Sequence, residues 1–533
     1  MQLPTANQMQ GLDQTTIIEI GIPGLILMEN AGLRTVDFLV EKFGDPSQKV
    51  VSIFVGPGNN GGDGLVVARH LMQRGALPRI LLLGHPQNIK GDAAINLAIA
   101  RQLELPIRVL ENEKDVHALA EEVKQSWLLV DALFGTGLKR EVTGHFATAI
   151  ELLNQAGPPV VAVDIPSGLD SDTGRVLGTA VHSSLTVTYG LAKAGHFLYP
   201  GRELTGELRV ADIGIPASVT DRANIRTRAL TAEEIKDFLP SRPPAGHKGI
   251  FGHLLVLAGS IGKTGAAILT ARAAMRTGVG LLTLCVAKNL NPIFETALTE
   301  AMTIALPHSK DRLSDADLES IEAALAGKKA CAIGPGLGTD PQTESLVLAL
   351  CRRTKLPMVI DADAINILAG KPSMLDDAPA PRILTPHPGE MSRLAGLPTS
   401  SVIEDRLQVA RKFAMEHNIY LVLKGADTVI AAPNGEAAIN TSGNVGMASG
   451  GMGDALTGII AGLLCQGLSP WLSCCLGVYV HGLAGDLVAK RCGIKGGLLA
   501  GELADTIPAA FSRLLSRKSI FPVKPDESPE KNI

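Results

Sequence analysis

Several features that would point to particular partners are scarce in this chain of 533 residues. Aromatic residues make up only 3% of it, and none of its seven cysteines belongs to a CxxC pair. The 49 basic and 53 acidic residues nearly balance, at a net charge of −4, and no long basic run is present. Without a basic patch, neither a nucleic acid nor a membrane surface is favoured as a partner.

The sequence also shows no pattern typical of a targeting segment. The first residues, MQLPTANQMQGLDQ, lack the basic and apolar regions of a secretory signal. No uninterrupted apolar run approaches the roughly 18 residues that span a bilayer. Unpaired thiols are typical of a reducing compartment. We therefore expect a cytoplasmic protein.

The chain is too long for one ordinary core at about 100–200 residues per domain, so two large domains are expected. Short apolar runs alternate with helical stretches, and these runs lack the alternation of half-exposed strands. Such runs are typical of parallel strands covered on both faces, which predicts an α/β fold. The expected strands lie at 50–55, 79–83, 128–131, 160–164 and 185–188, and then at 254–258, 281–286, 330–333, 358–361, 383–385 and 420–424.

The domain boundary is expected between residues 217 and 245. A short acidic helix pattern, LTAEEIKDFLP, is followed there by a stretch rich in proline and glycine. We place the first domain at 1–223 and the second at 224–517. The polar, proline-containing end, 518–533, is predicted to be a flexible tail.

A glycine-rich loop follows the first expected strand. The segment GPGNNGGDG, residues 56–64, satisfies GxGxxG, which lets backbone N–H groups and a helix start approach a phosphate. A redox dinucleotide site also needs a carboxylate at the end of the next strand, but that strand ends at Gly84 without one. A dehydrogenase is therefore disfavoured. The loop also carries Asn59, Asn60 and Asp63, more polar side chains than phosphate binding needs.

Polar side chains follow three strands of the first half. Asp131 and Asp164 end two strands, Ser167 follows the second, and Asn60 lies in the glycine-rich loop. Because ligands bind beyond the carboxyl ends of parallel strands, we expect these residues to converge. Oxygen ligands with few carboxylates suit a hard, weakly bound cation. Alternatively, each aspartate only caps the next helix.

The motifs NQMQGLD, LMENAG, GNNGGDG, VDALFGTG, VDIPSG and ADIGIP, in this order over residues 3–216, resemble the YjeF-type epimerase domain of NAD(P)H-hydrate repair enzymes. The resemblance implies a Rossmann-like three-layer domain that interconverts the R and S epimers of hydrated NADH or NADPH and binds potassium. The implied potassium ligands are Asn60, Asp131 and Ser167. The implied substrate contacts are Asn59, Asn60, Gly61, Gly62, Asp63, Gly135, Thr136, Gly137, Leu138, Lys139, Arg140, Glu141 and Asp164. Epimerisation needs an acid/base group beside the ring, and Asp164 is the candidate, assisted by Lys139 or Lys193.

The most informative segment of the second half is a glycine turn, GGMGD, that opens an apolar helix. Its glycines are Gly450, Gly451 and Gly453, and Asp454 follows them. Backbone N–H groups at such a helix start form an anion site, and the aspartate beside it can take a proton from a hydroxyl as phosphate arrives. Asp454 could instead be only an N-cap. The GKT at 262–264 is not a P-loop, because Leu257 stands where that motif requires glycine.

Further polar loops follow the strands of this half, including IGPGLG, DADAIN with Asp361 and Asp363, LTPHPGE with His387, and KGADT. Together with GGMGD, these motifs over residues 225–515 resemble the ribokinase-like dehydratase domain of the same repair enzymes. The resemblance implies ADP-dependent dehydration of the S epimer to NAD(P)H, giving AMP and phosphate, with magnesium accompanying the nucleotide. The implied catalytic base is Asp454. The implied contacts with the hydrate are Ala266, Gly338, His387 and Asp454. The implied contacts with the nucleotide are Lys424, Gly425, Ala426, Asp427, Thr428 and Gly453.

One position departs from the family, since Met452 stands where many relatives have a small hydroxyl residue; the glycines and the aspartate are intact, so we expect activity. The expected partners are small molecules, the hydrated cofactors and ADP, and we expect a homo-oligomer. Two other functions stay open at this point: a kinase that leaves a stable phosphate ester on a small alcohol, and a nucleotide-binding scaffold without activity.

Overall fold

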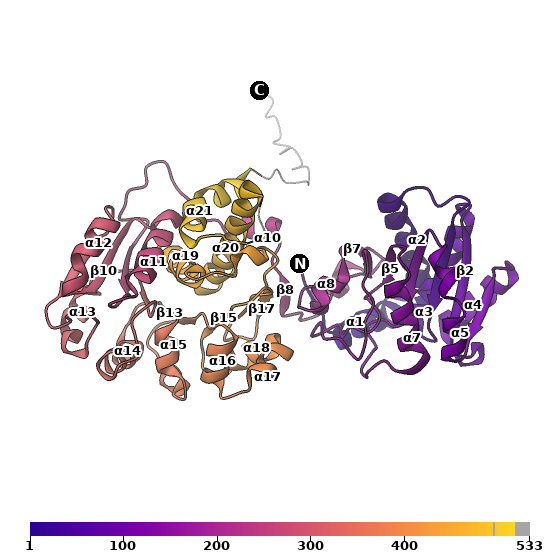
Figure 1. The fold of residues 1–533 in the computed structure, drawn as a ribbon, viewed down its shortest axis with the longest axis horizontal. Coiled ribbons are helices and arrows are strands. Elements are labelled where there is room, and N and C mark those ends of the chain that lie inside the picture. Colours follow the sequence, from indigo (N-terminus) through magenta and orange to yellow (C-terminus); the bar gives the residue numbers. More distant parts are fainter. Residues whose placement is uncertain (494–495, 517–533) are drawn as a thin grey trace, which may run out of the picture. The chain divides into compact units, whose positions relative to one another are not determined.

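A computed structural model describes residues 1–493 and 496–516, which form two compact units (Figure 1). The first is Met1–Ala229, and the second begins at Leu230, close to the boundary expected after residue 223. The tail predicted at 518–533 lies outside the described residues. Each unit is an α/β domain with a largely parallel sheet, which confirms the predicted fold class.

The first unit contains a seven-stranded parallel sheet with strand order β3-β2-β1-β4-β5-β6-β7. The strands are β1 (Val50–Val55), β2 (Leu77–Leu83), β3 (Ile107–Leu110), β4 (Leu128–Ala132), β5 (Val160–Val163), β6 (Leu185–Tyr189) and β7 (Glu207–Ala211). The short β8 (Thr227–Ala229) ends the unit. Because β4 pairs on the opposite side of β1 from β2, the winding reverses between β1 and β4, where such sheets bind ligands.

Two hydrophobic cores cover the faces of this sheet and explain its uninterrupted apolar strands. Val51 and Ile53 belong to the core that is shared with α2, α3 and α4, whereas Phe54 belongs to the opposite core with α5, α6 and α7. The result is the predicted three-layer arrangement. The helices are α1 (Ala6–Gln14), α2 (Gly24–Phe43), α3 (Asn59–Gln73), α4 (Gly91–Gln102), α5 (Glu113–His117), α6 (Ala120–Lys124), α7 (Gly144–Gln155), α8 (Gly201–Thr205) and α9 (Ala217–Arg222).

The second unit contains a larger sheet with strand order β11-β10-β9-β12-β13-β14-β15-β16-β17. It is parallel up to β15 and antiparallel from β15 to β17. The strands are β9 (His253–Leu257), β10 (Leu281–Ala287), β11 (Met302–Leu306), β12 (Ala330–Ile333), β13 (Met358–Ile360), β14 (Arg382–Leu384), β15 (Tyr420–Leu423), β16 (Val429–Ala431) and β17 (Ala437–Ile439).

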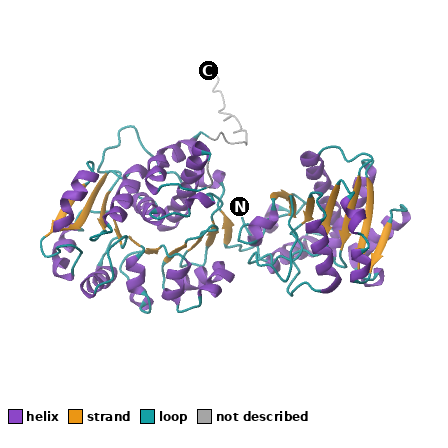
Figure 2. Cartoon of the chain, viewed as in Figure 1, coloured by secondary structure: helices purple, strands orange, loops and turns teal. Residues whose placement is uncertain are grey.

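Helices cover both faces of this sheet (Figures 1 and 2), with α11, α19, α20 and α21 on one side and α14 to α18 on the other. The helices are α10 (Ala232–Lys236), α11 (Thr264–Thr277), α12 (Asn291–Ala297), α13 (Leu318–Ala324), α14 (Pro341–Arg353), α15 (Asp363–Leu368), α16 (Pro388–Ala395), α17 (Thr399–Glu404), α18 (Arg406–Glu416), α19 (Met452–Cys465), α20 (Pro470–Cys492) and α21 (Ala500–Leu515).

By length and composition α20 could cross a membrane, although polar residues interrupt its apolar runs. However, 67% of its most apolar window is buried inside the unit. Its one acidic residue, Asp486, accepts hydrogen bonds from the Gly443 backbone and the Asn444 amide. This is the pattern of a core helix.

Candidate functional site

The first site is a cavity of about 820 Å³ at the carboxyl ends of β1, β4, β5 and β6. It lies at the reversal of strand order, where the topology predicts a ligand. The predicted contact residues that line it are Asn59, Asn60, Asp63, Gly135, Thr136, Gly137, Leu138, Lys139, Arg140 and Asp164. Among the described residues, the other substrate contacts and potassium ligands predicted for the first unit do not line this cavity: Gly61, Gly62, Glu141, Asp131 and Ser167.

The glycines of the first loop are required mainly by backbone packing. A Cβ on Gly56 would overlap the Leu133 carbonyl, and one on Gly61 would overlap the Gly56 carbonyl. A Cβ on Gly58 would meet no atom within 4 Å. The motif therefore serves first to bring α3 close to the ends of β1 and β4.

Asp164 is held at the cavity wall by a buried lysine. Lys193 Nζ donates to Asp164 Oδ1 at 2.6 Å, and the Thr188 hydroxyl donates to the same oxygen at 3.0 Å. Burial by itself raises the pKa of Asp164, but the Lys193 ammonium and these hydrogen bonds outweigh it, so the pKa is lowered. Asp164 is therefore a carboxylate at neutral pH.

Two further aspartates line the same cavity, and the pKa of each is raised. Burial, with the Asp164 charge adding to it, raises the pKa of Asp63 well above its usual range. Burial also raises the pKa of Asp13 to about 6, against the opposing effect of Lys193. Sequence reasoning assigned no role to Asp13, although it belongs to the quoted NQMQGLD motif. The first site thus combines an ionised carboxylate with neighbouring groups that can hold protons.

Beside this cavity, Asp131 and Ser167 form a buried polar cluster. Asp131 is fully buried and accepts from the Ser167 hydroxyl at 2.6 Å and from the Ser167 backbone at 2.8 Å. Burial raises its pKa to about 6, and no lysine or arginine among the described residues forms an ion pair with it. The Ser167 hydroxyl also receives the Phe134 N–H, and Asn60 Oδ1 lies near the adjacent Gly135. Asn60, Asp131 and Ser167 thus lie on neighbouring loops, whereas Asp164 lies in the cavity wall and is bound to Lys193.

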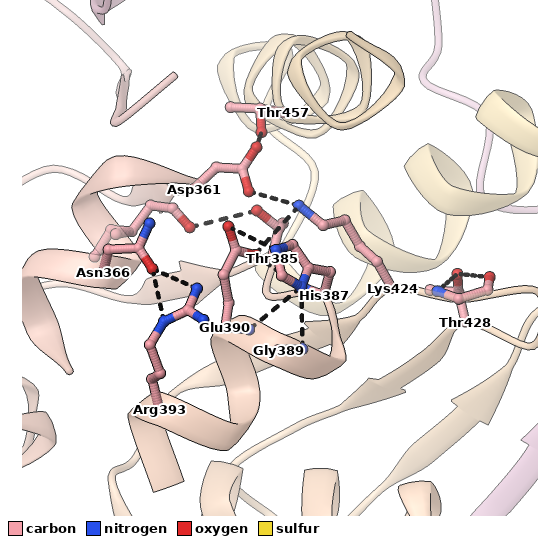
Figure 3. Close-up of polar contacts among 12 residues, drawn as sticks. Asp361, Asn366, Thr385, His387, Gly389, Glu390, Arg393, Lys424, Thr428 and Thr457 are labelled. Carbon is pink, nitrogen blue, oxygen red and sulfur yellow. Dashed lines mark hydrogen bonds and ion pairs between the residues drawn. The ribbon is translucent and has the colours of Figure 1, made fainter. Parts of the chain in front are cut away.

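The second site lies where β13, β14 and β15 end against the start of α19 (Figure 3). Gly451, the N-cap of α19, has φ of 85°, a left-handed conformation that favours glycine. Asp454 lies in the first turn of that helix. Burial raises the pKa of Asp454 to about 6, with a further contribution from Asp361, against the opposing charge of Lys424. Asp454 is therefore a stronger base than an ordinary aspartate, yet still largely ionised at neutral pH.

Lys424 comes to this helix start from the end of β15. Its ammonium donates to Asp361 at 2.8 Å, and Glu390 lies 3.9 Å away (Figure 3). A Cβ on Gly453 would lie only 3.2 Å from this ammonium. Glycine at 453 therefore allows the positive charge to lie directly against the turn.

The remaining predicted nucleotide contacts form a closed turn after β15. The Thr428 hydroxyl donates to the Gly425 carbonyl at 2.9 Å, while Gly425 and Ala426 are exposed. Asp427 is buried and pairs with Arg406 at 3.1 Å. Exposed backbone at 425–426 can reach a ligand, whereas Asp427 has a structural partner.

The predicted hydrate contacts lie on neighbouring loops of the same sheet edge. His387 is the N-cap of α16 and accepts from the Gly389 backbone at 3.0 Å. Burial lowers its pKa, with a further contribution from Lys424. The Gly338 N–H donates to Asp363 at 2.8 Å, and Ala266 lies in the first turn of α11. The structure thus brings residues from distant segments to one edge.

Two family patterns match this chain. The family described as "YjeF-related protein N-terminus" matches residues 24–195, and the family described as "NAD(P)H-hydrate dehydratase" matches residues 254–509. Each match falls within one structural unit.

Curated relatives match along nearly the full length. A bifunctional NAD(P)H-hydrate repair enzyme from Moorella thermoacetica is 45% identical, over 96% of this chain and 97% of the relative. Enzymes with the same name from Thermofilum pendens and Escherichia coli are 38% and 35% identical, over 96% and 92% of this chain and 97% and 90% of theirs. Among solved structures, the ADP/ATP-dependent NAD(P)H-hydrate dehydratase of Bacillus subtilis is 34% identical, covering 54% of this chain and 98% of its own, with a TM-score of 0.48.

Proposed function

Because the chain belongs to the family of bifunctional NAD(P)H-hydrate repair enzymes, we propose that it restores hydrated NADH and NADPH by two linked reactions. The first unit interconverts the R and S epimers, and the second dehydrates the S epimer at the expense of ADP, giving AMP and phosphate. The observation that carries this proposal is Asp454 beside the glycine turn of α19, with Lys424 against the same turn.

In the second unit, Asp454 accepts the proton of the substrate hydroxyl while that oxygen forms a bond to the terminal phosphorus of ADP and AMP leaves. Lys424 and the free N–H groups at the start of α19 stabilise the negative charge of the transferred group. The carbon–oxygen bond then breaks as the lone pair of the ring nitrogen expels phosphate. Loss of a proton from the adjacent carbon restores the double bond.

Magnesium would accompany the nucleotide in this reaction. Within the described part of the chain, no group of three or more histidine, cysteine, aspartate or glutamate side chains could hold a metal ion. A cation bound mainly by phosphate oxygens and water, as magnesium usually is, fits this arrangement. Its contribution would be to neutralise phosphate charge.

In the first unit, Asp164 is the proposed acid/base group for epimerisation, and Lys193 keeps it ionised. Asn59, Asp63 and the loop at 135–141 would hold the substrate around it. Potassium would be held by Asn60, Asp131 and Ser167. A buried carboxylate that forms no ion pair with a lysine or arginine of the described residues supports this site. Bound there, the cation would balance the charge of Asp131.

Two wider proposals concern the whole molecule. The buried, unpaired thiols, among them Cys285, Cys331 and Cys474, support a cytoplasmic location. Exposed isoleucines near the start of the first unit, Ile18 and Ile26, support assembly into a homo-oligomer.

The test is an absorbance assay in which acid-generated hydrate is mixed with ADP and magnesium. The protein should restore the absorbance of NADH, and Asp454→Asn should abolish the recovery. If both epimers stay untouched while phosphate is transferred stably to another small alcohol, the protein is a kinase and the proposal is wrong.

A further inference from the structure

In the second site, Asp361 links the side chain of Lys424 to helix α19. Its side chain is 1% exposed, at the carboxyl end of β13. One carboxylate oxygen accepts from Lys424 Nζ at 2.8 Å, and the other accepts from the Thr457 hydroxyl at 2.7 Å (Figure 3). The carboxylate therefore ties the end of β15 to the first two turns of α19.

The tie places the lysine at the glycine turn. Asp361 Oδ2 lies 3.8 Å, and Lys424 Nζ 3.2 Å, from where a Cβ of Gly453 would be. A buried ammonium is costly without a counter-charge. Burial by itself lowers the pKa of Lys424, but Asp361 and then Glu390 outweigh it and raise the pKa, so the lysine stays charged.

The same carboxylate is part of the charge balance around Asp454. Asp361 from β13 and Asp363 from α15 disfavour its ionised form, whereas Lys424 favours it. Asp363 is itself paired with Lys263 at 3.0 Å. The other titratable groups around Lys424 are Glu390 and His387 of α16 and His481 of α20, which bonds the Met452 carbonyl.

We propose that Asp361 is a positioning residue of the dehydratase site: it holds the Lys424 ammonium against the glycine turn and keeps its own carboxylate at the start of α19, the helix whose first turn bears Asp454. This inference rests on the proposed dehydratase function. Asp361 contacts neither substrate nor nucleotide in this role and acts through Lys424 and Asp454.

The test compares two variants by the pH dependence of kcat/KM for the S epimer. Asp361→Asn removes a negative charge near Asp454 and frees the Lys424 ammonium. The acid limb of the pH profile should therefore move to lower pH by on the order of one unit. Its kcat should fall about tenfold, since a charged hydrogen bond that positions Lys424 is lost. Lys424→Met should move the limb in the opposite direction, to higher pH. A purely structural role would not produce opposite shifts.

Thr457→Val is the matched control, because it removes the other hydrogen bond to Asp361 but leaves every charge in place. Its acid limb should stay at the wild-type pH. The proposal is overturned if folded Asp361→Asn keeps the wild-type limb, or if Lys424→Met shifts it downwards. If Asp361→Asn fails to fold, Asp361→Glu replaces it: the longer side chain displaces the carboxylate from Lys424, so kcat should fall, and a wild-type kcat would overturn the proposal.

A second readout needs no turnover. Infrared difference spectra of wild type minus Asp454→Asn report the protonated carboxyl of Asp454 during a pH titration. As pH rises, the band of the protonated Asp454 carboxyl should vanish at lower pH in the Asp361→Asn background than in the wild-type background. An unchanged titration would overturn the inference. A wild-type protein that never restores NADH would defeat the proposed function, whereas this titration tests Asp361 separately.

Discussion

Lys193 Nζ donates a hydrogen bond to Asp164 Oδ1 at 2.6 Å, and the two residues follow neighbouring strands, β6 and β5, of the first unit. Both side chains are largely buried, and Asp164 has a φ of 64°, which a residue other than glycine rarely adopts. Backbone strain of this kind is found mainly where the surrounding structure over-determines a functional side chain. The pair is therefore the centre of the proposed epimerase site.

Asp164→Asn should slow conversion of the R epimer by roughly 10²–10⁴-fold, since the acid/base group is lost but the fold of the loop is kept. Repair of the S epimer should be unchanged, because the second unit performs it. Chromatographic separation of the epimers during the assay measures both rates. Equal loss of both activities, or loss of neither, would contradict the assignment of Asp164.

The pH dependence of the dehydratase should report Asp454. Its pKa is raised to about 6 by burial, so below pH 6 the carboxyl is protonated and cannot accept the substrate proton. Activity on the purified S epimer should therefore rise as pH increases through about 6 and then level off. Asp13 in the first unit also has a pKa of about 6, so Asp13→Asn is the control. If the rise in activity occurs at a different pH in Asp13→Asn, the group that titrates is not Asp454.

Potassium should stabilise the first unit specifically. Thermal unfolding in potassium chloride should occur at higher temperature than in tetramethylammonium chloride of equal ionic strength, because a ligand of the folded state shifts the equilibrium. The difference should disappear in Asp131→Asn, which loses the proposed anionic ligand. An equal difference in both proteins would place the ion elsewhere.

The glycine-rich loop predicts contrasting effects for two alanine substitutions. Gly61→Ala should lower the free energy of unfolding of the first unit by about 1–3 kcal/mol, because the new methyl group overlaps the Gly56 carbonyl. Gly58→Ala should change it little, since the position is open and its φ of −98° suits alanine. Urea unfolding followed by circular dichroism measures both. Equal destabilisation would show that the loop, and not the close packing, is sensitive to substitution.

Sequence patterns predicted the buried parallel strands well, and β1 and β12 begin and end where expected. They missed the edge strands β3, β7 and β11, whose residues are mostly half-exposed or exposed, and the short β8, β16 and β17. Of these, β16 and β17 pair antiparallel. An edge strand buries too little apolar surface to leave a continuous apolar run. The strands that define both sites are among those predicted.

The sequence by itself determined the α/β class, the two-domain division, the strand-end loop that holds Asp164 and the glycine turn that opens the helix of Asp454, because these depend on local runs, glycine turns and motifs. Only the tertiary structure decided which loops meet. Asp361 and Lys424 are 63 residues apart yet in hydrogen-bond contact, and Asp13 reaches the cavity from the first helix. Strand order comes from long-range pairing and packing, which no local pattern records.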